Sequence, residues 1–246
     1  MDKRFLGFLA VLALVLGGIF FLFNTDKASA PNQKSSATSG LTNHVIGKGT
    51  TGVKLVEYGD FQCPACAAFE PAVAQVRQKY GDQITFQFRN FPLTQIHPNA
   101  LASARAAEAA DIQGKYWEMH DLLYQNQKEW EAATDAVTAF NQYASQLGLD
   151  VNKFKTDFKS SAINDRVQTD LKEGLRLEVN STPTFFLNGK KISNPNPTIE
   201  AFSTIIDAEI VKKGGKPPTS NAAPNPADTT PVTDPAPTAT PAPAGE

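Results

Sequence analysis

The 246-residue chain contains two cysteines, and both lie in the run Cys63-Pro64-Ala65-Cys66. Residues 53–58 before this run are strand-like, and Gly59-Asp60 closes them. Residues after it follow a helical apolar period through Tyr80, and residues 84–88 alternate apolar and polar side chains as a strand does. A strand, a helix and a strand of these lengths form a βαβ unit, whose two strands are parallel. The sequence therefore predicts both thiols at a junction between a strand and a helix.

Helical patterns dominate the chain from about residue 98 to 178. After them come a short strand at 184–187, an Asn188-Gly189 turn that is typical of a hairpin, a second arm at 190–192 and a helix at 198–212. The predicted order is β-α-β, a helical block, and β-β-α, which indicates an α/β fold. A block of about 80 residues is too long for a loop, so we expect a helical subdomain packed on the sheet.

The N-terminal part of the chain carries a long apolar run, from Phe5 to Phe23, without a charged residue. As a helix it would extend about 28 Å, close to the thickness of the hydrocarbon core of a bilayer. Because Lys3 and Arg4 precede it, residues 1–23 predict a cytoplasmic tip and a single transmembrane anchor, with the catalytic domain extracytoplasmic. The alternative is a signal peptide cleaved after Ala28-Ser29-Ala30, which would secrete the protein. The length of the run favours an anchor in the cell membrane.

The segments on either side of the folded unit 43–213 have the composition of unfolded chain. Residues 24–42 are rich in small polar residues and predict a flexible spacer, and residues 214–246 interleave Pro with Ala and Thr and predict a disordered tail. The unit between them is long enough for a single hydrophobic core. The formal net charge of −2 argues against nucleic acid as a partner.

The Cys-Pro-Ala-Cys motif combines two thiols with a helix N-terminus. Pro64 suits the first helical turn, because the N–H that proline lacks would have no partner there. Cys63 would then lie where backbone N–H groups and the helix dipole favour a thiolate. Cys66 lies one turn further along, so Cys63 can attack a disulfide and Cys66 can resolve the mixed disulfide. With only Pro and Ala between the cysteines, and no imidazole or cation to help, we expect a moderate and not an extreme lowering of the Cys63 pKa.

A metal site and a purely structural disulfide are the alternatives to redox chemistry at this motif. A metal site needs two further ligands, but His44, His97 and His120 are far apart in the sequence and form no ligand pair. A structural disulfide across so short a loop would restrain the unfolded chain only weakly. The motif therefore favours redox catalysis by the two cysteines, with no metal and no separate cofactor.

Four stretches of the sequence carry a resemblance to a known family. They are VEYGDFQCPAC (56–66), RNFPL (89–93), GKYWEMHD (114–121) and STPTFFLNG (181–189). With these stretches the chain resembles, from about Gly52 to Lys212, the membrane-anchored DsbA-like thiol–disulfide oxidoreductases. A CxxC motif alone is moderately specific, but a CxxC motif followed over a hundred residues later by Thr-Pro-Thr-Phe and a hairpin is a strong signature.

The resemblance implies a thioredoxin fold with an inserted helical domain, and it assigns roles to individual residues. It implies that Cys63 is the nucleophile, that Cys66 is the resolving thiol and that Pro183 is a cis-proline beside the active-site disulfide. It also implies that the backbone of Thr182 pairs with an extended substrate peptide. Without the resemblance, Pro183 would be interpreted as a trans proline at the entry to a strand.

Three further residues are candidates for the site. Glu57 matches a buried acidic residue that helps proton transfer from the resolving thiol in the family, and the alternative is a solvated charge on the strand. No basic partner for Glu57 is evident in the sequence. Phe61 and Phe91 are candidates for an apolar surface around the disulfide that contacts unfolded substrates, with core packing as the alternative.

The resemblance predicts an anchored enzyme that introduces disulfides into exported, cysteine-containing proteins and is reoxidised by a membrane-embedded redox partner. A disulfide reductase or isomerase with the same site is the first alternative, because the direction of exchange depends on the reduction potential. The second alternative, from another class, is a non-catalytic anchored module that binds peptides or delivers a metal.

Overall fold

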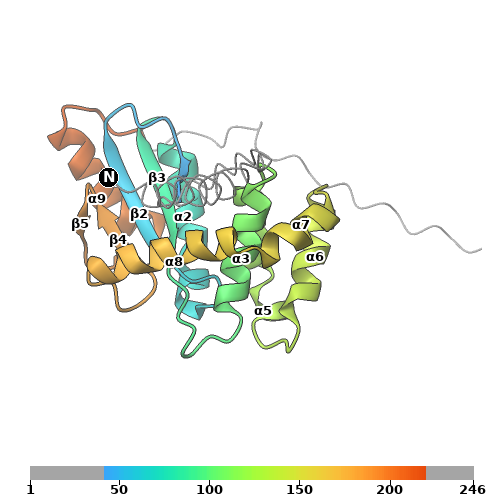
Figure 1. Cartoon of the computed structure of the whole chain (residues 1–246). Helices are drawn as coiled ribbons and strands as arrows, with labels where there is room; N and C mark the ends of the chain where they lie inside the picture. Colours follow the sequence, from blue (N-terminus) through green and yellow to red (C-terminus); the bar gives the residue numbers. More distant parts are fainter. Residues whose placement is uncertain (1–41, 220–246) are drawn as a thin grey trace, which may run out of the picture. The chain divides into compact units, whose positions relative to one another are not determined.

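The computed structural model of the chain describes residues 42–219, which fold around one mixed five-stranded sheet (Figure 1). The strands are β1 (His44–Ile46), β2 (Val53–Gly59), β3 (Ile84–Asn90), β4 (Thr184–Leu187) and β5 (Lys190–Lys191), and their order in the sheet is β1-β3-β2-β4-β5. The predicted anchor at 1–23, the predicted spacer up to residue 41 and the predicted tail from residue 220 onward lie outside the described residues.

Helix α2 (Pro64–Tyr80) links the two central strands and confirms the predicted βαβ unit. β2 and β3 are parallel, with Gly59 opposite Asn90 at their C-terminal ends. β4 runs antiparallel to β2, and Tyr58 pairs with Thr184. The junction between β2 and α2 therefore lies beside the start of β4.

Six helices occupy the chain between β3 and β4 and form the predicted helical insertion. They are α3 (Ala100–Asp111), α4 (Tyr116–Gln125), α5 (Gln127–Trp130), α6 (Ala136–Gln146), α7 (Val151–Lys159) and α8 (Ser161–Arg176). Gly148 follows α6 in the left-handed conformation, with φ +70°, and the Asp150 side chain caps α7 by accepting hydrogen bonds from two backbone N–H groups. The last helix, α9 (Ile199–Lys212), follows β5 and packs against α2 and β2.

Aromatic side chains join the sheet to the helices on both sides of the core. Phe185 of β4 packs edge-on against Phe202 of α9, with ring centroids 5.1 Å apart. Phe86 of β3 packs against Trp117 of α4, with centroids 5.8 Å apart. Burial of such rings stabilises the fold by about 25 cal/mol for each Å² of apolar surface removed from water. The insertion and the sheet therefore share one core.

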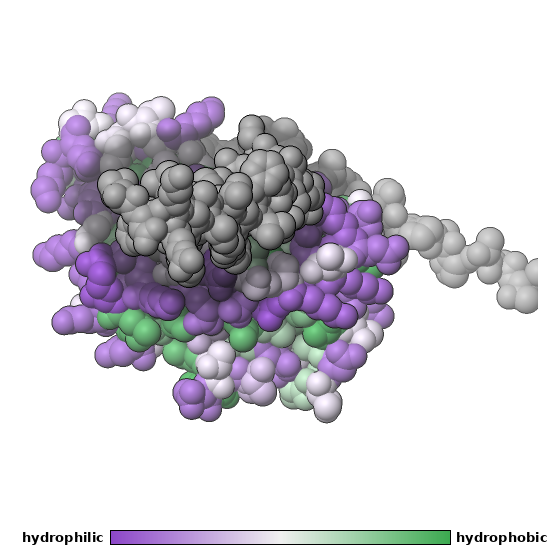
Figure 2. Space-filling model, viewed as in Figure 1, coloured by the Kyte–Doolittle hydropathy of each residue, from purple (hydrophilic) through white to green (hydrophobic). Residues whose placement is uncertain are grey.

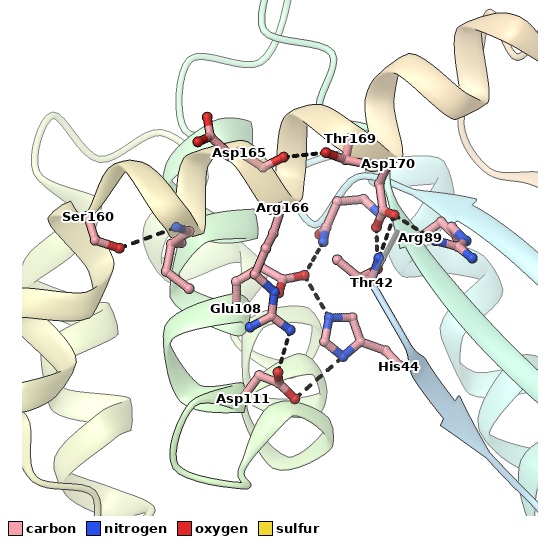
Figure 3. Close-up of polar contacts among 12 residues, drawn as sticks. Thr42, His44, Arg89, Glu108, Asp111, Ser160, Asp165, Arg166, Thr169 and Asp170 are labelled. Atoms are coloured by element: carbon pink, nitrogen blue, oxygen red, sulfur yellow. Dashed lines mark hydrogen bonds and ion pairs between the residues drawn. The ribbon is translucent and has the colours of Figure 1, made fainter. Parts of the chain in front are cut away.

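A buried polar network ties β1 and the insertion to the sheet (Figure 3). Asp170 of α8 is fully buried and accepts hydrogen bonds from the Thr42 hydroxyl and from Arg89, whose Nη1 lies 2.8 Å from Oδ1. On the neighbouring part of the network, Nε2 of His44 lies 2.7 Å from Oε1 of Glu108 on α3. Because buried charges are costly unless they are paired, these contacts fix how α3 and α8 sit on the sheet.

The N-terminal edge of the folded unit differs from the prediction. The sequence does not predict β1, because three residues are too few to show a period. The strand pairs antiparallel with β3, with His44 opposite Phe88. Thr42, which composition assigns to the spacer, is 3% exposed and bonded to Asp170, so the ordered unit includes it.

Hydrophilic side chains cover much of the face shown in Figure 2, and hydrophobic side chains gather in a band beside α8. Exposed apolar side chains in the described part of the chain include Ile96 and Leu175, the latter on α8. Among residues 42–219, no helix is both long and apolar enough to cross a bilayer.

Candidate active site

The turn between β2 and α2 is held by the buried carboxylate of Asp60. Oδ1 accepts a hydrogen bond from the backbone N–H of Gln62 at 2.9 Å, and Oδ2 accepts one from the N–H of Leu93 at 3.0 Å and lies 2.6 Å from Nδ1 of His97. The Asp60 carbonyl oxygen accepts a hydrogen bond from the N–H of Cys63. An aspartate that bonds the backbone two residues ahead favours a tight turn, so Asp60 fixes the direction in which the chain enters α2.

The two cysteines occupy the first turn of α2, as predicted. Cys63 is the N-cap residue, with φ −69° and ψ 121°, and Pro64 is the first helical residue. Cys63 is 7% exposed and Cys66 is 1% exposed, and both are free thiols. One sulfur therefore lies near the surface and the other lies beneath it.

The loop before β4 meets Cys63 across the site. The Thr182–Pro183 peptide bond is cis, which confirms what the family resemblance implies. Sγ of Cys63 lies 3.4 Å from the Thr182 carbonyl oxygen, to which the protonated thiol donates. The Asn194 side-chain amide donates to the Pro183 carbonyl oxygen at 2.7 Å and holds the loop in place. The fold thus brings together residues that are 119 positions apart in the sequence.

Hydrogen bonds lower the pKa of Cys63 from 9.0 to about 5. The thiol of Cys66 contributes most, and the Thr182 hydroxyl and the backbone N–H groups of Cys66 and Ala65 add to it, while burial opposes them. Oγ1 of Thr182 is buried without a hydrogen-bond partner within residues 42–219, so its hydroxyl is free to turn toward the sulfur. The pKa is lower than the moderate value predicted, because a thiol, a hydroxyl and two amides act together at one atom.

Cys66 and Glu57 are buried weak acids below Cys63. Burial raises the pKa of the Cys66 thiol well above its usual value, and the hydrogen bond to Cys63 and the charge of Glu57 raise it further. Burial, and then the nearby Glu70, raise the pKa of the Glu57 carboxyl. Glu57 is 1% exposed, and its Oε2 has no hydrogen-bond partner among the described residues. Glu57 is therefore a buried acid and not a solvated charge on the strand.

Two charged residues of α2 lie near Glu57, and sequence reasoning did not find them. Glu70 and Arg77 form an ion pair with an N–O distance of 2.5 Å, and both side chains are largely buried. The positive charge of Arg77 opposes the rise in the Glu57 pKa, while the ion pairs of Arg77 are with Glu70 and Asp121. Their spacing in the sequence could have identified them. Cys63, Glu70 and Arg77 follow one another at intervals of seven residues, which places them on one side of a helix. A pocket of about 220 Å³ between α2 and α4, lined by both residues and Asp121, opens beside the pair.

Phe61 and Phe91 are core residues, so the prediction that they line a substrate surface is wrong. Phe61 is 1% exposed and packs against Phe88 and Tyr124, with ring centroids 5.1 Å and 5.0 Å away. Phe91 is 2% exposed and lies so close to Gly174 of α8 that a Cβ there would approach its ring to 2.6 Å. The helical insertion covers both rings, with α4 over Phe61 and α8 over Phe91.

Two groups of potential metal ligands lie away from the cysteines. They are His44, Glu108 and Asp111 in one group (Figure 3), and Glu70, His120 and Asp121 in the other. An arginine already supplies a positive charge to each: Arg166 contacts Glu108 and Asp111, and Arg77 contacts Glu70 and Asp121. Ion pairing therefore accounts for both groups within the described part of the chain.

A family model for thioredoxin matches residues 39–208. Among curated proteins, the Na(+)/H(+) antiporter NhaA 1 of Mycolicibacterium gilvum is 37% identical over 204 residues, which cover 79% of this chain and 32% of that protein. The Na(+)/H(+) antiporter NhaA 3 of Salinispora tropica is 37% identical over 181 residues, which cover 72% of this chain and 27% of that protein. The chain thus spans about a third of the length of these relatives.

Solved structures share the fold over most of the described residues. BdbD from Bacillus subtilis, in its oxidised form, matches with a TM-score of 0.60 at 21% identity, over 70% of this chain and 97% of BdbD. Alpha-DsbA1 from Wolbachia pipientis matches with a TM-score of 0.62 at 20% identity, over 73% of this chain and 98% of that one. The chain therefore belongs to the thioredoxin family and has the fold of the DsbA-like oxidoreductases.

Proposed function

We propose that this chain is an extracytoplasmic thiol–disulfide oxidoreductase that forms disulfides in exported proteins. The observation that carries the proposal is the contrast between its two sulfurs: the pKa of Cys63 is lowered to about 5, and the pKa of Cys66 is raised well above its usual value. At neutral pH Cys63 is ionised and Cys66 is protonated. This contrast suits Cys63 to exchange with substrates and Cys66 to resolve the mixed disulfide that results.

The reaction passes two electrons from a substrate dithiol to the enzyme. A substrate thiolate attacks Sγ of Cys63 in the Cys63–Cys66 disulfide; a mixed disulfide forms, and Cys66 leaves with the electron pair and takes up a proton. A second substrate thiolate then attacks the substrate sulfur of the mixed disulfide, which forms the substrate disulfide and releases Cys63 as a thiolate. An oxidised redox partner in the membrane accepts the two electrons and restores the enzyme disulfide.

Two neighbouring residues serve these steps. Glu57 exchanges a proton with Cys66, since it is buried and its raised pKa keeps a proton available to the leaving sulfur. An extended substrate peptide pairs with the backbone of Thr182 in the loop that precedes β4. This placement is supported by the distance of 3.4 Å between the Thr182 carbonyl oxygen and Sγ of Cys63.

The enzyme acts outside the cytoplasm, at the cell membrane. The apolar run from Phe5 to Phe23 supports an anchor, and cleavage after Ala30 with secretion is the alternative. The names of the curated relatives also support a location at the membrane. Proteins named as Na(+)/H(+) antiporters, a class that exchanges ions across membranes, contain a segment similar to this chain.

The lowered pKa of Cys63 favours oxidation of substrates over their reduction. A thiol pKa of about 5 stabilises the reduced form at pH 7 by up to about 2.7 kcal/mol, because the sulfur is ionised over the two pH units between 5 and 7. Because water near the sulfur screens part of this energy, we count about half of it. That half raises the reduction potential of the couple by about 30 mV, which makes it more oxidising.

The reduction potential of the Cys63–Cys66 couple, measured by equilibration with glutathione, tests the proposal. We expect a potential above about −200 mV at pH 7, which is more oxidising than the glutathione pool. We also expect it to fall by about 30 mV per pH unit around neutrality, and not by about 60 mV, because one thiol is already ionised. A potential near −270 mV would favour the reductase alternative, and stoichiometric metal binding without thiol turnover would favour the non-catalytic module.

A further inference from the structure

The backbone from Phe61 to Cys63 is held by a side chain from the helical insertion. Gln127, the first residue of α5, is 3% exposed. Its Nε2 donates to the Phe61 carbonyl oxygen at 2.7 Å and to the Cys63 carbonyl oxygen at 3.1 Å. Both hydrogens of this amide are therefore used on the backbone carbonyl groups of Phe61 and Cys63.

The side chain of Gln62 makes the reciprocal contact with the insertion. Its Nε2 donates to the Glu131 carbonyl oxygen at 2.6 Å, and its Oε1 accepts a hydrogen bond from the Asn99 backbone N–H at 2.6 Å. The side-chain amide of Asn99 donates in turn to carbonyl oxygens of residues between 130 and 133. Three neutral amides thus connect the turn before the nucleophile to the segment that contains α5.

The contact from Gln127 has an electrostatic consequence for Cys63. Carbonyl oxygens carry partial negative charge, and a carbonyl beside a thiolate raises the pKa of that thiol. The two N–H bonds of Gln127 direct their positive ends at the carbonyls of Phe61 and Cys63 and oppose this effect. The Cys63 carbonyl also accepts a hydrogen bond from the Ala67 N–H. They also hold the backbone where α2 begins, with the N–H groups of Ala65 and Cys66 bonded to the sulfur.

We propose that Gln127 is a positioning residue for disulfide exchange, which holds the backbone from Phe61 to Cys63 so that the Cys63 sulfur meets the N–H groups of the first turn of α2. This inference rests on the proposed function and deepens it, because it makes the insertion part of the catalytic unit. A merely structural role would stabilise the reduced and oxidised proteins equally. A positioning role stabilises the reduced protein, with its thiolate, more than the oxidised one.

Gln127→Glu and Gln127→Leu in the full chain test the proposal. Glutamate has the size of glutamine, but its carboxylate cannot donate, and leucine removes the donor without adding a charge. For both we expect the Cys63 pKa, followed by thiolate absorbance, to rise, by at least one unit in Gln127→Glu. We expect the equilibrium constant with which the protein disulfide oxidises glutathione to fall about tenfold in Gln127→Glu, a shift of about 30 mV. The matched control, Gln75→Glu on the exposed face of α2, should change neither quantity.

If Gln127→Leu folds and keeps the wild-type pKa and equilibrium constant, the positioning role is overturned. If either variant is poorly folded, Gln127→Asn is compared with wild type by the free energies of unfolding of its reduced and oxidised forms. A larger loss in the reduced form supports the proposal, and equal losses contradict it. Failure of the proposed function would look different, because the wild-type protein itself would then show an unshifted Cys63 pKa and no exchange.

Discussion

Cys63→Ser is expected to reduce the oxidation of a reduced substrate protein to the uncatalysed rate, whereas Cys66→Ser is expected to stop thiol–disulfide exchange at the mixed disulfide. The first change removes the sulfur whose pKa is lowered to about 5, and a serine hydroxyl does not ionise near neutral pH. The second change keeps this thiolate, which attacks a disulfide of a substrate and releases one substrate thiolate, but it removes the thiol that would resolve the mixed disulfide. Mixed disulfides between Cys63 and substrates should therefore accumulate in cells that produce Cys66→Ser.

Diagonal electrophoresis of these cells, non-reducing in the first dimension and reducing in the second, separates the trapped partners. We expect the partners to be exported proteins that contain cysteine, and the double variant Cys63→Ser/Cys66→Ser should trap none. Recovery of no mixed disulfide would refute the assignment of nucleophile and resolving thiol. Recovery of cytosolic partners alone would contradict the extracytoplasmic site of action.

Glu57→Gln is expected to slow, by about 100-fold, the steps in which Cys66 gains or loses a proton. The Cys66 thiol has a raised pKa, so its release as a bare thiolate is unfavourable, and glutamine cannot supply the proton that we assign to Glu57. Stopped-flow fluorescence during reduction of the protein by a small dithiol measures this step. Glu200→Gln, at an exposed position of α9, is the matched control and should leave the rate unchanged. A wild-type rate in Glu57→Gln would remove Glu57 from the mechanism.

The same substitution should change stability in a pH-dependent way. The raised pKa of Glu57 means that the folded protein keeps a proton that the unfolded chain releases, so the wild type loses stability as the pH rises from about 4.5 through the folded pKa. Glutamine does not titrate. The free energy of unfolding of Glu57→Gln, measured with denaturant relative to that of the wild type, should therefore increase between pH 4 and pH 8, and a constant difference would contradict a buried ionisable carboxyl.

The order of the main elements was predictable because it depends on local patterns. The helical period after Pro64, the alternation in 84–88 and the Asn188-Gly189 turn each report on neighbouring residues, and α2, β3 and the β4–β5 hairpin follow them. β1 was not predictable, because it is short and stabilised by β3 and by contacts with α3 across the fold. Local sequence patterns do not identify partners that lie so far apart along the chain.

The candidate site was also predictable only where it depends on local sequence. The position of Cys63 and Cys66 at a helix start follows from the CxxC motif, and the cis bond before Pro183 follows only from the family resemblance. The depth of the pKa shift at Cys63 depends on Thr182, which the fold brings from far along the chain. The contact from Gln127 likewise depends on how the insertion packs, and its sequence neighbourhood gives no sign of it.

The titration of Cys63 in the reduced protein, followed by thiolate absorbance with Cys63→Ser as the blank, measures directly whether the protein holds a stabilised thiolate. We expect an apparent pKa of about 5. It also fixes the sign of the linked stability: the contribution of this group is complete above the unfolded pKa of about 9 and is lost as the pH falls through 5, so the reduced protein should lose stability relative to the oxidised protein upon acidification. An apparent pKa of 8.5 or higher would contradict a stabilised thiolate and, with it, the proposed mechanism.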